Sequence, residues 1–430
     1  YFRDLHATLL SARERVTICG WCLTPLMPLQ RGNREKEAAS VFAEVLRDVS
    51  ERVDVYVLLW CGAPIVFEPT QESVKQAVET LKRIAPRVQC AIDHAAPFSH
   101  DQHQKAVTVD GDVAYVGGMD ISTFQGDRWD TSEHRLRFGP NWHDVQVRIR
   151  GEAVDDVQSN FCQRWNATVG WNELEPLKRT TADRSWTTPA QIVRTIPTGF
   201  YPFAPDGEYG IYHVLIAAIR RAERYIYLEN QYLWAPEIVD ELRDAINRPR
   251  SDRFRVVIVL PAKAYSGKYD NDEHVRALAD ADGGRGIFSA YSLYAGGPAI
   301  GNSGFRYLPI YVHAKVSIVD DEWFSVGSAN LNGRGIATDA EMNVHGIDPD
   351  VARHLRIRLW SEHLGISEEQ VAIADPCDLL DSAWKDAARQ METAITSMTL
   401  PPACMVRTYI PGQNVGSRAL DLIQAATLEH

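Results

Sequence analysis

The sequence predicts an α/β fold of two pseudo-twofold-related lobes, each an α/β/α sandwich with a mixed sheet. The first observation is that helical patterns alternate with short runs rich in β-branched and aromatic residues, as in residues 53–60 and 255–260. The second observation is an internal repeat, because the same order of patterns returns about 210 residues later. A duplicated α/β unit indicates two copies of one lobe.

The elements of the repeat match one by one. In the first lobe a helical pattern ends at residues 9–15, and a strand-like run follows at 16–18. In the second lobe the equivalent helix ends at 216–224, and its strand-like run lies at 225–228. Each copy continues with a further helix and one of the two runs named above. Residues 355–365 then predict a helix that ends at its final glycine, since glycine commonly follows the last helical turn.

This organisation predicts five segments along the chain. The first lobe covers residues 1–171 and the second lobe covers 191–365. Residues 172–190 are polar and follow neither periodicity, which is typical of an exposed linker. Residues 366–427 predict a helical tail packed on the second lobe, and residues 428–430 are typical of a cloning-tag remnant.

The composition limits the possible partners. With 45% hydrophobic residues the chain can bury a large core, but its net charge of −12 disfavours a broad basic surface for nucleic acid or anionic lipid. No apolar run approaches the roughly 18–20 residues of a membrane span, so no transmembrane segment is expected. The seven cysteines lack the spacing of a disulfide framework and are expected to be ordinary thiols. Cytoplasmic and secreted locations are both compatible with these features.

The most specific part of the repeat is a doubled motif. Both copies read H-x-K-x4-D-x6-G-[GS]-x-[DN] and align without a gap. The first copy contains His103, Lys105, Asp110, Gly118 and Asp120, and the second contains His313, Lys315, Asp320, Ser328 and Asn330. One such motif can arise by chance, whereas two in register inside a larger repeat indicate a shared function.

The doubled His and Lys residues predict a chemistry. Residues two apart in a strand point to the same face, so His103 projects with Lys105 and His313 projects with Lys315. Pseudo-twofold symmetry would bring both pairs into one active site at the interface between the lobes. Two ammonium groups there would offset the charge of a phosphodiester and of its pentacoordinate transition state. One imidazole could attack phosphorus while the other protonates the leaving group.

Three aspartates of the motifs are expected to support the backbone. Asp110 and Asp320 follow a strand at the point where the chain turns, and should organise that turn. Asp120 is also counted as structural, because a carboxylate at that position would repel a phosphate.

Other residues are predicted to bind phosphate or to orient the imidazoles. The backbone at Gly118 and Ser328 should allow the close approach that a phosphate pocket needs. Asn330 should donate a hydrogen bond to a phosphate oxygen. Asp144 and Glu341 follow the two motifs and are predicted to hold the far ring nitrogens of the two histidines, as the third member of a catalytic triad does.

Further segments resemble the eukaryotic-type branch of the phospholipase D superfamily, whose members carry two His-Lys-Asp motifs. The resemblance covers residues 1–365 and is to a compact, bacterial-like form without regulatory modules. The resembling segments are 128–131 (RWDT), 133–136 (EHRL), 142–145 (WHDV), 227–232 (YLENQY), 311–315 (YVHAK) and 359–365 (LWSEHLG).

The resemblance implies a role for each main residue. His103 would be the nucleophile and form a phosphohistidine, and His313 would protonate the departing alcohol and then activate water or a primary alcohol. Because the two motifs are nearly equivalent, the reverse assignment of the histidines stays open. Lys105, Lys315 and Asn330 would bind phosphate oxygens. No metal or other cofactor would be needed.

The predicted function is hydrolysis of the distal phosphodiester of a glycerophospholipid at a membrane surface, with transphosphatidylation to primary alcohols. The products would be phosphatidic acid and the free head-group alcohol. Alternatives are a cardiolipin-synthase-like phosphatidyltransferase, a nuclease of the same superfamily and a lipid-binding pseudoenzyme. The missing membrane-span pattern weighs against the synthase, the acidic charge weighs against nucleic acid as a partner, and the intact His/Lys sets weigh against the pseudoenzyme.

Four more residues are candidates for the pocket. Glu229, Asn230 and Gln231 end a strand of the second lobe, where sites gather in α/β units. His134 is a further candidate, although a histidine satisfied inside the fold is the commoner case. Residues 295–307, rich in glycine, predict a loop that covers the core or contacts lipid.

Overall fold

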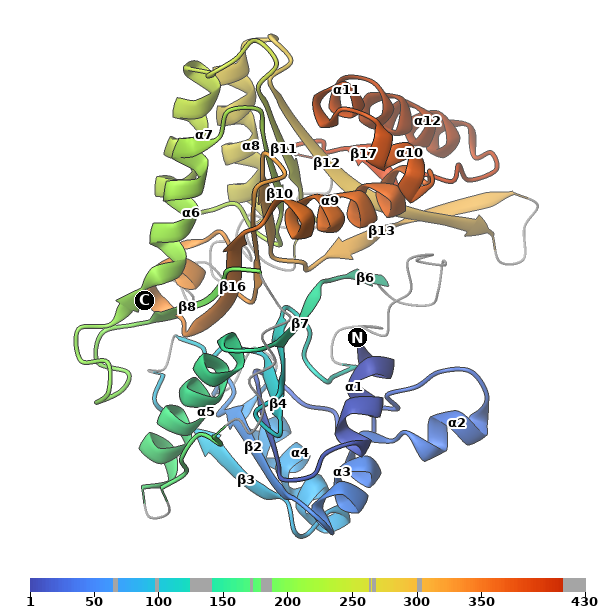
Figure 1. The fold of residues 1–430 in the computed structure, drawn as a ribbon. Coiled ribbons are helices and arrows are strands. Elements are labelled where there is room, and N and C mark those ends of the chain that lie inside the picture. The colour runs from blue at the N-terminus through green and yellow to red at the C-terminus, as the bar shows by residue number, and fades with distance from the viewer. Residues whose placement is uncertain are drawn as a thin grey trace.

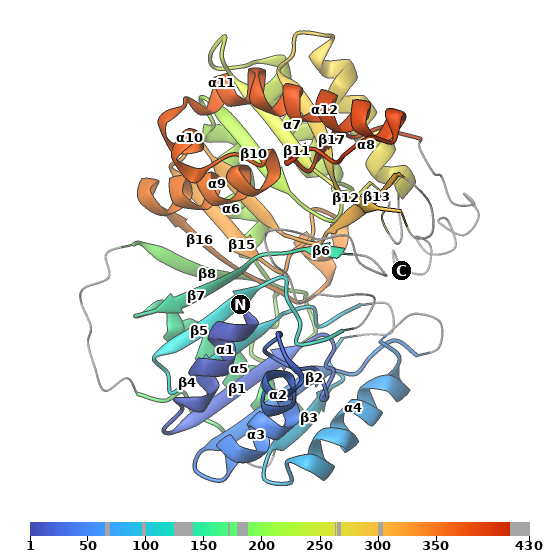
Figure 2. The same ribbon diagram turned by 90° about the vertical axis from the view of Figure 1, so that its right-hand side faces the viewer.

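The computed structural model describes residues 1–64, 69–96, 100–123, 141–170, 173–178, 188–262, 264, 268–299 and 304–412. Over these ranges the chain forms two α/β lobes stacked one above the other (Figure 1, Figure 2). The predicted fold class is confirmed, because each lobe has a mixed sheet covered by helices and the C-terminal region is largely helical. The domain boundaries remain a prediction.

The sheet of the first lobe has six strands in the order β3-β2-β1-β4-β5-β7. The strands are β1 (Arg15–Gly20), β2 (Asp54–Trp60), β3 (Gln89–Asp93), β4 (Ala106–Val109), β5 (Val113–Gly117) and β7 (Gln146–Arg150). The helices are α1 (Phe2–Leu10), α2 (Arg34–Ala39), α3 (Phe42–Ser50), α4 (Gln71–Ile84) and α5 (Ala153–Val169). Alternate residues of β2 face opposite layers, so Val57 packs with the α1, α3 and α4 side while Leu58 packs with the α5 side.

The second sheet has eleven strands and repeats the first pattern. Its strands are β6 (Asn141–His143), β8 (Ala190–Ile196), β9 (Glu208–Tyr209), β10 (Tyr225–Glu229), β11 (Arg255–Val259), β12 (Phe288–Pro298), β13 (Phe305–Val312), β14 (Val316–Val319), β15 (Trp323–Gly327), β16 (Glu341–Ile347) and β17 (Val406–Thr408). Its helices are α6 (Gly210–Arg221), α7 (Pro236–Asn247), α8 (Lys268–Asp282), α9 (Pro349–Leu364), α10 (Glu368–Ile373), α11 (Pro376–Asp381), α12 (Ala383–Ser397) and the π-helical turn η1 (Arg334–Thr338). In both lobes three parallel strands are followed by antiparallel ones, with β14 and β15 in the places of β4 and β5.

Two segments contain strands that the sequence did not predict. Residues 295–307 do not form one loop, because β12 continues to Pro298 and pairs with β13 from Phe305 onward. A Cβ at Gly296 would lie 2.6 Å from the Pro401 side chain, so this glycine permits close packing rather than a turn. The tail is not purely helical, since β17 follows α12 and pairs with β12. Residues 413–430, with the predicted tag remnant, lie outside the described ranges.

The two lobes exchange short pieces of backbone. Strand β6, which follows the first motif in the chain, pairs in parallel with β13 of the second sheet. In the opposite direction, Gln102 forms a β-bridge with Ala340. One hydrophobic cluster contains residues of both lobes, so the interface between the sheets is part of the core.

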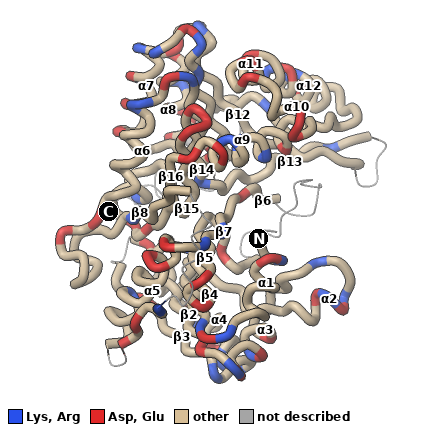
Figure 3. The backbone as a smooth tube through the Cα atoms, viewed as in Figure 1, with Lys and Arg blue, Asp and Glu red and all other residues tan. Residues whose placement is uncertain are grey.

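Two further features bear on possible partners. Lys and Arg positions are interspersed with Asp and Glu positions over both lobes (Figure 3). None of the helices within the described ranges has the length and apolar character needed to cross a bilayer.

Candidate active site

Asp110 and Asp320 fasten the strands that carry the two His/Lys pairs. The Asp110 carboxylate accepts the backbone N–H groups of residues 13–15 at 2.8, 2.8 and 3.0 Å. The Asp320 carboxylate accepts those of residues 223–225 at 2.7, 2.8 and 2.7 Å. Both aspartates have positive φ, 56° and 59°, a conformation that Asp tolerates better than most residues. Each motif is thereby tied to the start of the neighbouring strand, β1 or β10.

His103 lies just before β4, and its Nδ1 and backbone N–H form hydrogen bonds with the second lobe. Its Nδ1 is 2.8 Å from Oε1 of Glu341 and 3.2 Å from the carbonyl oxygen of Ser328. Its backbone N–H donates to the carbonyl of Ala340 at 2.9 Å. Glu341 is fully buried at the start of β16. The histidine of the first lobe is therefore oriented by a carboxylate of the second.

His313 has the reciprocal arrangement. Its Nδ1 is 2.7 Å from Oδ2 of Asp144, the residue after β6. Its backbone N–H donates to the carbonyl of His143 at 2.8 Å. The ring of Trp142 packs against the imidazole with 4.6 Å between centroids. Each histidine therefore uses Nδ1 and its backbone N–H to bind two consecutive residues of the opposite lobe.

The two lysines have unequal surroundings. Lys105 Nζ is 3.4 Å from Oδ2 of Asp120 and 5.6 Å from the ring centroid of Trp21. Lys315 Nζ is 3.3 Å from Oε1 of Gln231. A carboxylate and an indole thus oppose the first ammonium group, whereas a neutral amide oxygen opposes the second. The two half-sites are similar in backbone and differ in these contacts of the lysines.

Both ammonium groups act on one imidazole. Burial lowers the pKa of His103 well below its ordinary value, and Lys105 and Lys315 lower it further, because each disfavours a second positive charge nearby. Burial also raises the pKa of the Glu341 carboxyl, against the opposing effect of Lys105. Cations of both motifs therefore converge on His103, in its neutral form.

The chain is similar to several known proteins. Residues 215–361 match the family model described as "Cardiolipin synthase, PLD-like domain". Phospholipase D alpha 4 of Arabidopsis thaliana is 26% identical over 501 residues, which cover 87% of this chain and 65% of that protein. Phospholipase D A of Dictyostelium discoideum is 24% identical over 465 residues, which cover 85% of this chain and 35% of that protein.

These matches support the phospholipase D superfamily as the family of this chain. It spans less than two thirds of the length of these curated relatives. The crystal structure of phosphatidylserine synthase from Haemophilus influenzae Rd KW20 shares the fold, with a TM-score of 0.55 and 13% identity over 93% of each chain.

Two motif positions, Ser328 and Gly118, lie against the carboxylates of Glu341 and Asp144. The Ser328 hydroxyl donates to Glu341 and accepts the backbone N–H of Met342 at 3.0 Å. A Cβ at Gly118 would lie 2.1 Å from Oδ1 of Asp144. At both positions the close approach in this structure is to the carboxylate that orients a histidine, and the predicted contact with phosphate stays a prediction.

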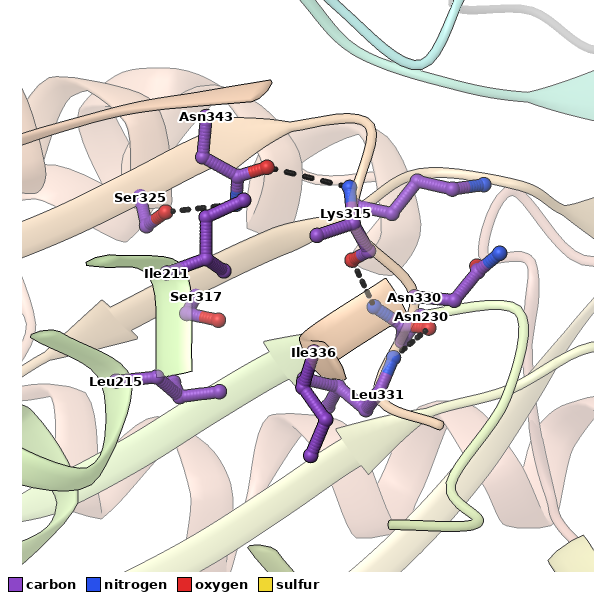
Figure 4. Close-up of a pocket in the computed structure, with 11 residues that line it drawn as sticks. Ile211, Leu215, Asn230, Lys315, Ser317, Ser325, Asn330, Leu331, Ile336 and Asn343 are labelled. Atoms are coloured by element: carbon purple, nitrogen blue, oxygen red, sulfur yellow. Dashed lines mark hydrogen bonds between the residues drawn. The ribbon is translucent and has the colours of Figure 1, made fainter. Parts of the chain in front are cut away.

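Asn330 lies in a small pocket beside Lys315 (Figure 4). Asn230, which also lines the pocket, is committed to the fold, because its Oδ1 accepts the backbone N–H groups of Leu331 and Tyr232, each at 3.1 Å. Oδ1 of Asn330 is buried without a hydrogen-bond partner among the described residues. Of the two Oδ1 atoms, that of Asn230 is therefore occupied, and that of Asn330 could accept a hydrogen bond from a ligand donor.

Glu229 lies fully buried beneath the second motif, and its place near the pocket stays a prediction. The carboxylate is fully buried and accepts hydrogen bonds from Nε2 of His143 at 2.7 Å, Nε2 of His363 at 2.8 Å and the hydroxyl of Tyr227 at 2.5 Å. Although burial opposes the shift, Glu229 raises the pKa of His143 well above its usual value. Because the His143 carbonyl binds the N–H of His313, this ion network supports the second histidine.

The same three groups could in principle hold a metal ion. Tetrahedral zinc with bonds of about 2.0–2.1 Å would hold its ligand atoms about 3.3 Å apart. The observed separations of 2.7 and 2.8 Å are those of hydrogen bonds. The spacing favours a hydrogen-bonded His–Glu–His network.

Sequence reasoning missed the roles of several residues. Trp21 stands about 210 positions before Gln231, and both contact the lysine of their own motif, so the repeat alignment contained the signal. Glu362 and His363 both contact the buried His–Glu network, although their segment was noted only for its resemblance to the family. His134 lies outside the described residues.

Proposed function

We propose that this protein is a phospholipase D that converts a glycerophospholipid to phosphatidic acid and the free head-group alcohol. The proposal rests chiefly on the two reciprocal pairs, His103 with Glu341 and His313 with Asp144. In each pair Nδ1 is occupied by a carboxylate, which leaves Nε2 as the nitrogen for phosphoryl or proton transfer. Relatives named phospholipase D support the choice of a phospholipid as substrate.

The first step would form a covalent phosphoenzyme. Nε2 of His103 attacks phosphorus, the P–N bond forms, and the P–O bond to the head group breaks as His313 gives its proton to the leaving oxygen. The lowered pKa of His103 supports its assignment as the nucleophile, because only the neutral imidazole carries a free electron pair. The nearby ammonium groups of Lys105 and Lys315 would stabilise the charge on the phosphoryl oxygens.

The second step would release the phosphatidyl group. His313, now neutral, takes a proton from water, the new P–O bond forms, and the P–N bond to His103 breaks. A primary alcohol in place of water would give a phosphatidyl-alcohol by the same route. Asn330 would bind a phosphoryl oxygen through its amide N–H in both steps.

A phosphatidyltransferase is the second candidate, because the family model over residues 215–361 is described as a cardiolipin synthase domain. Such an enzyme would use the same phosphohistidine and a lipid alcohol as acceptor. The two functions differ in the acceptor and not in the first step.

Product analysis distinguishes these candidates. The full chain is incubated with vesicles of mixed phosphatidylcholine, phosphatidylethanolamine and phosphatidylglycerol, with plasmid DNA and with 1-butanol, and products are identified by mass spectrometry. Phosphatidic acid and phosphatidylbutanol are expected. Cardiolipin as the main product would favour the transferase, and cleaved plasmid with intact lipid would contradict the proposal.

A further inference from the structure

We propose that Arg334 is a positioning residue that clamps the segment before His103 onto the second lobe. The inference rests on the function proposed above. It concerns the residues that hold His103 against Glu341 and so orient the imidazole of the proposed nucleophile.

Arg334 forms the centre of a buried ion cluster. Its Nε and NH2 atoms lie 2.8 and 3.0 Å from the two carboxylate oxygens of Asp339. The same NH2 lies 3.0 Å from Oδ1 of Asp101, which comes from the first lobe. The guanidinium side chain is only 11% exposed. Arg334 also begins the π-helical turn η1, and such turns are rare and frequently lie at functional sites.

The cluster leads to His103 through backbone hydrogen bonds. The N–H of Asp101 donates to the Asp339 carboxylate at 2.8 Å, and its carbonyl accepts the N–H of Ala340 at 2.9 Å. The Ala340 carbonyl then accepts the N–H of His103 at 2.9 Å. Asp101 lies two residues before His103, and Ala340 lies directly before Glu341. Their hydrogen bond therefore holds the two segments together beside the His103–Glu341 pair. Loss of the guanidinium should let the two segments separate at this point.

The negative charge on Asp101 destabilises the folded protein, because the carboxylate is buried. Burial raises its pKa to about 6, since the opposing effect of Arg334 does not fully offset burial. The carboxylate of Asp339 also raises it, whereas the indole N–H of Trp21 and the ammonium of Lys105 lower it. His100 faces the cluster from the same segment, with Nδ1 3.9 Å from Oδ1 of Asp339.

The raised pKa of Asp101 distinguishes a role in function from a role in stability. A carboxyl group with a raised folded-state pKa makes the protein less stable above about pH 6 and more stable as pH falls through that value. The ion pair with Arg334 needs the carboxylate and is lost over the same range. A carboxylate whose ion pair served stability alone would be expected to have a lowered pKa and to make the protein less stable as pH falls.

The test uses Arg334→Gln, Arg334→Lys and Asp101→Asn, with Arg356→Gln as a matched control. Arg356 is also buried and pairs with a carboxylate, at 2.7 and 2.8 Å from Asp321, but it does not contact either histidine. Three quantities are measured: Tm, kcat for phospholipid cleavage, and the His103 ring signal in ¹⁵N-histidine NMR without substrate. The His103 signal is assigned by its loss in His103→Gln.

Arg334→Gln is expected to shift the His103 signal and to lower kcat about 10²-fold, as misplaced reacting groups do. Arg334→Lys should recover only part of the rate, because it keeps the charge without the fork that reaches two carboxylates. Asp101→Asn should lower kcat while leaving Tm unchanged or raised. In the wild type, activity should fall as pH drops below about 6, because Asp101 takes up a proton and the ion pair with Arg334 is lost, and Asp101→Asn should not show this fall. Arg356→Gln should lower Tm and leave both the signal and kcat unchanged.

Other outcomes would overturn the inference. An unchanged His103 signal and kcat in Arg334→Gln and Asp101→Asn would assign the cluster to stability alone. If Arg334→Gln does not fold, Arg334→Lys and Asp101→Asn carry the same test. If the wild-type protein cleaves no phospholipid but the variants still shift the His103 signal, the proposed function fails while the clamp stands.

Discussion

Asp144 belongs to the first lobe and Glu341 to the second, and each binds the histidine of the opposite lobe. The separations from Nδ1 are 2.7 Å for Asp144–His313 and 2.8 Å for Glu341–His103. In both cases the backbone N–H of the histidine binds the carbonyl of the residue directly before the carboxylate. Relative motion of the lobes would therefore disturb both histidines together.

The roles of the two histidines can be separated with a substrate whose leaving group needs no proton. His313→Ala should release about one equivalent of p-nitrophenol from a p-nitrophenyl phosphodiester and then stall, because His103 can still form the P–N bond. His103→Ala should release none above background, a loss of several orders of magnitude. Stopped-flow absorbance measures the burst, and a burst in His103→Ala but not in His313→Ala would reverse the assignment.

The exchanged carboxylates should matter for rate more than for folding. Asp144→Asn and Glu341→Gln keep the shape of each side chain but remove the charge that fixes the tautomer of its histidine, at an expected cost of about 10²–10⁴ in kcat. Steady-state kinetics and thermal unfolding of each variant provide the check. Wild-type kcat in either variant would show that the pair is not part of the mechanism.

Gly118 should tolerate no side chain. Gly118→Ala would place its Cβ 2.1 Å from the Asp144 carboxylate, displace it from His313 and reduce kcat about as far as Asp144→Asn does. Gly333→Ala is the matched control, since a Cβ there meets nothing within 4 Å. Equal activity of the two alanine variants would contradict the predicted steric effect.

The buried His103 should make the protein less stable in acid. Its pKa is lowered by burial and two ammonium groups, so the unfolded chain takes up a proton near pH 6.5 that the native protein does not. Wild type should therefore lose stability relative to His103→Gln as pH falls below about 6.5, by up to about 1.4 kcal/mol per pH unit. Urea titrations of both proteins at pH 7, 6 and 5 measure this difference, and a constant difference would show that folding does not lower the pKa of His103.

Chelation should leave the enzyme active. The proposed steps use side chains of the protein, and the spacing of the Glu229 network matches hydrogen bonds. Dialysis against EDTA is expected to change neither kcat nor Tm. A loss that added zinc or calcium restores would assign a metal to the site or to the network.

The fold class and the doubled motif were predictable because they depend on periodicity and on a repeat. Strand pairing was less so, since the glycines at 296 and 297 resemble a loop until β13 is seen opposite them. The exchange of Asp144 and Glu341 depends on how the lobes stack, which spacing within one lobe does not contain. The clamp was not predictable, because Arg334 occupies the position of Phe124 in the repeat and so has no charged counterpart there.

Strand β6 leaves its own lobe to extend the sheet of the other, so neither half is complete alone. A solitary copy of either half would present an unfinished sheet edge and a histidine without its carboxylate. Such a unit could complete itself only by association with a second molecule. Fusing both copies in one polypeptide makes that association independent of concentration, and it frees each half to diverge chemically from the other.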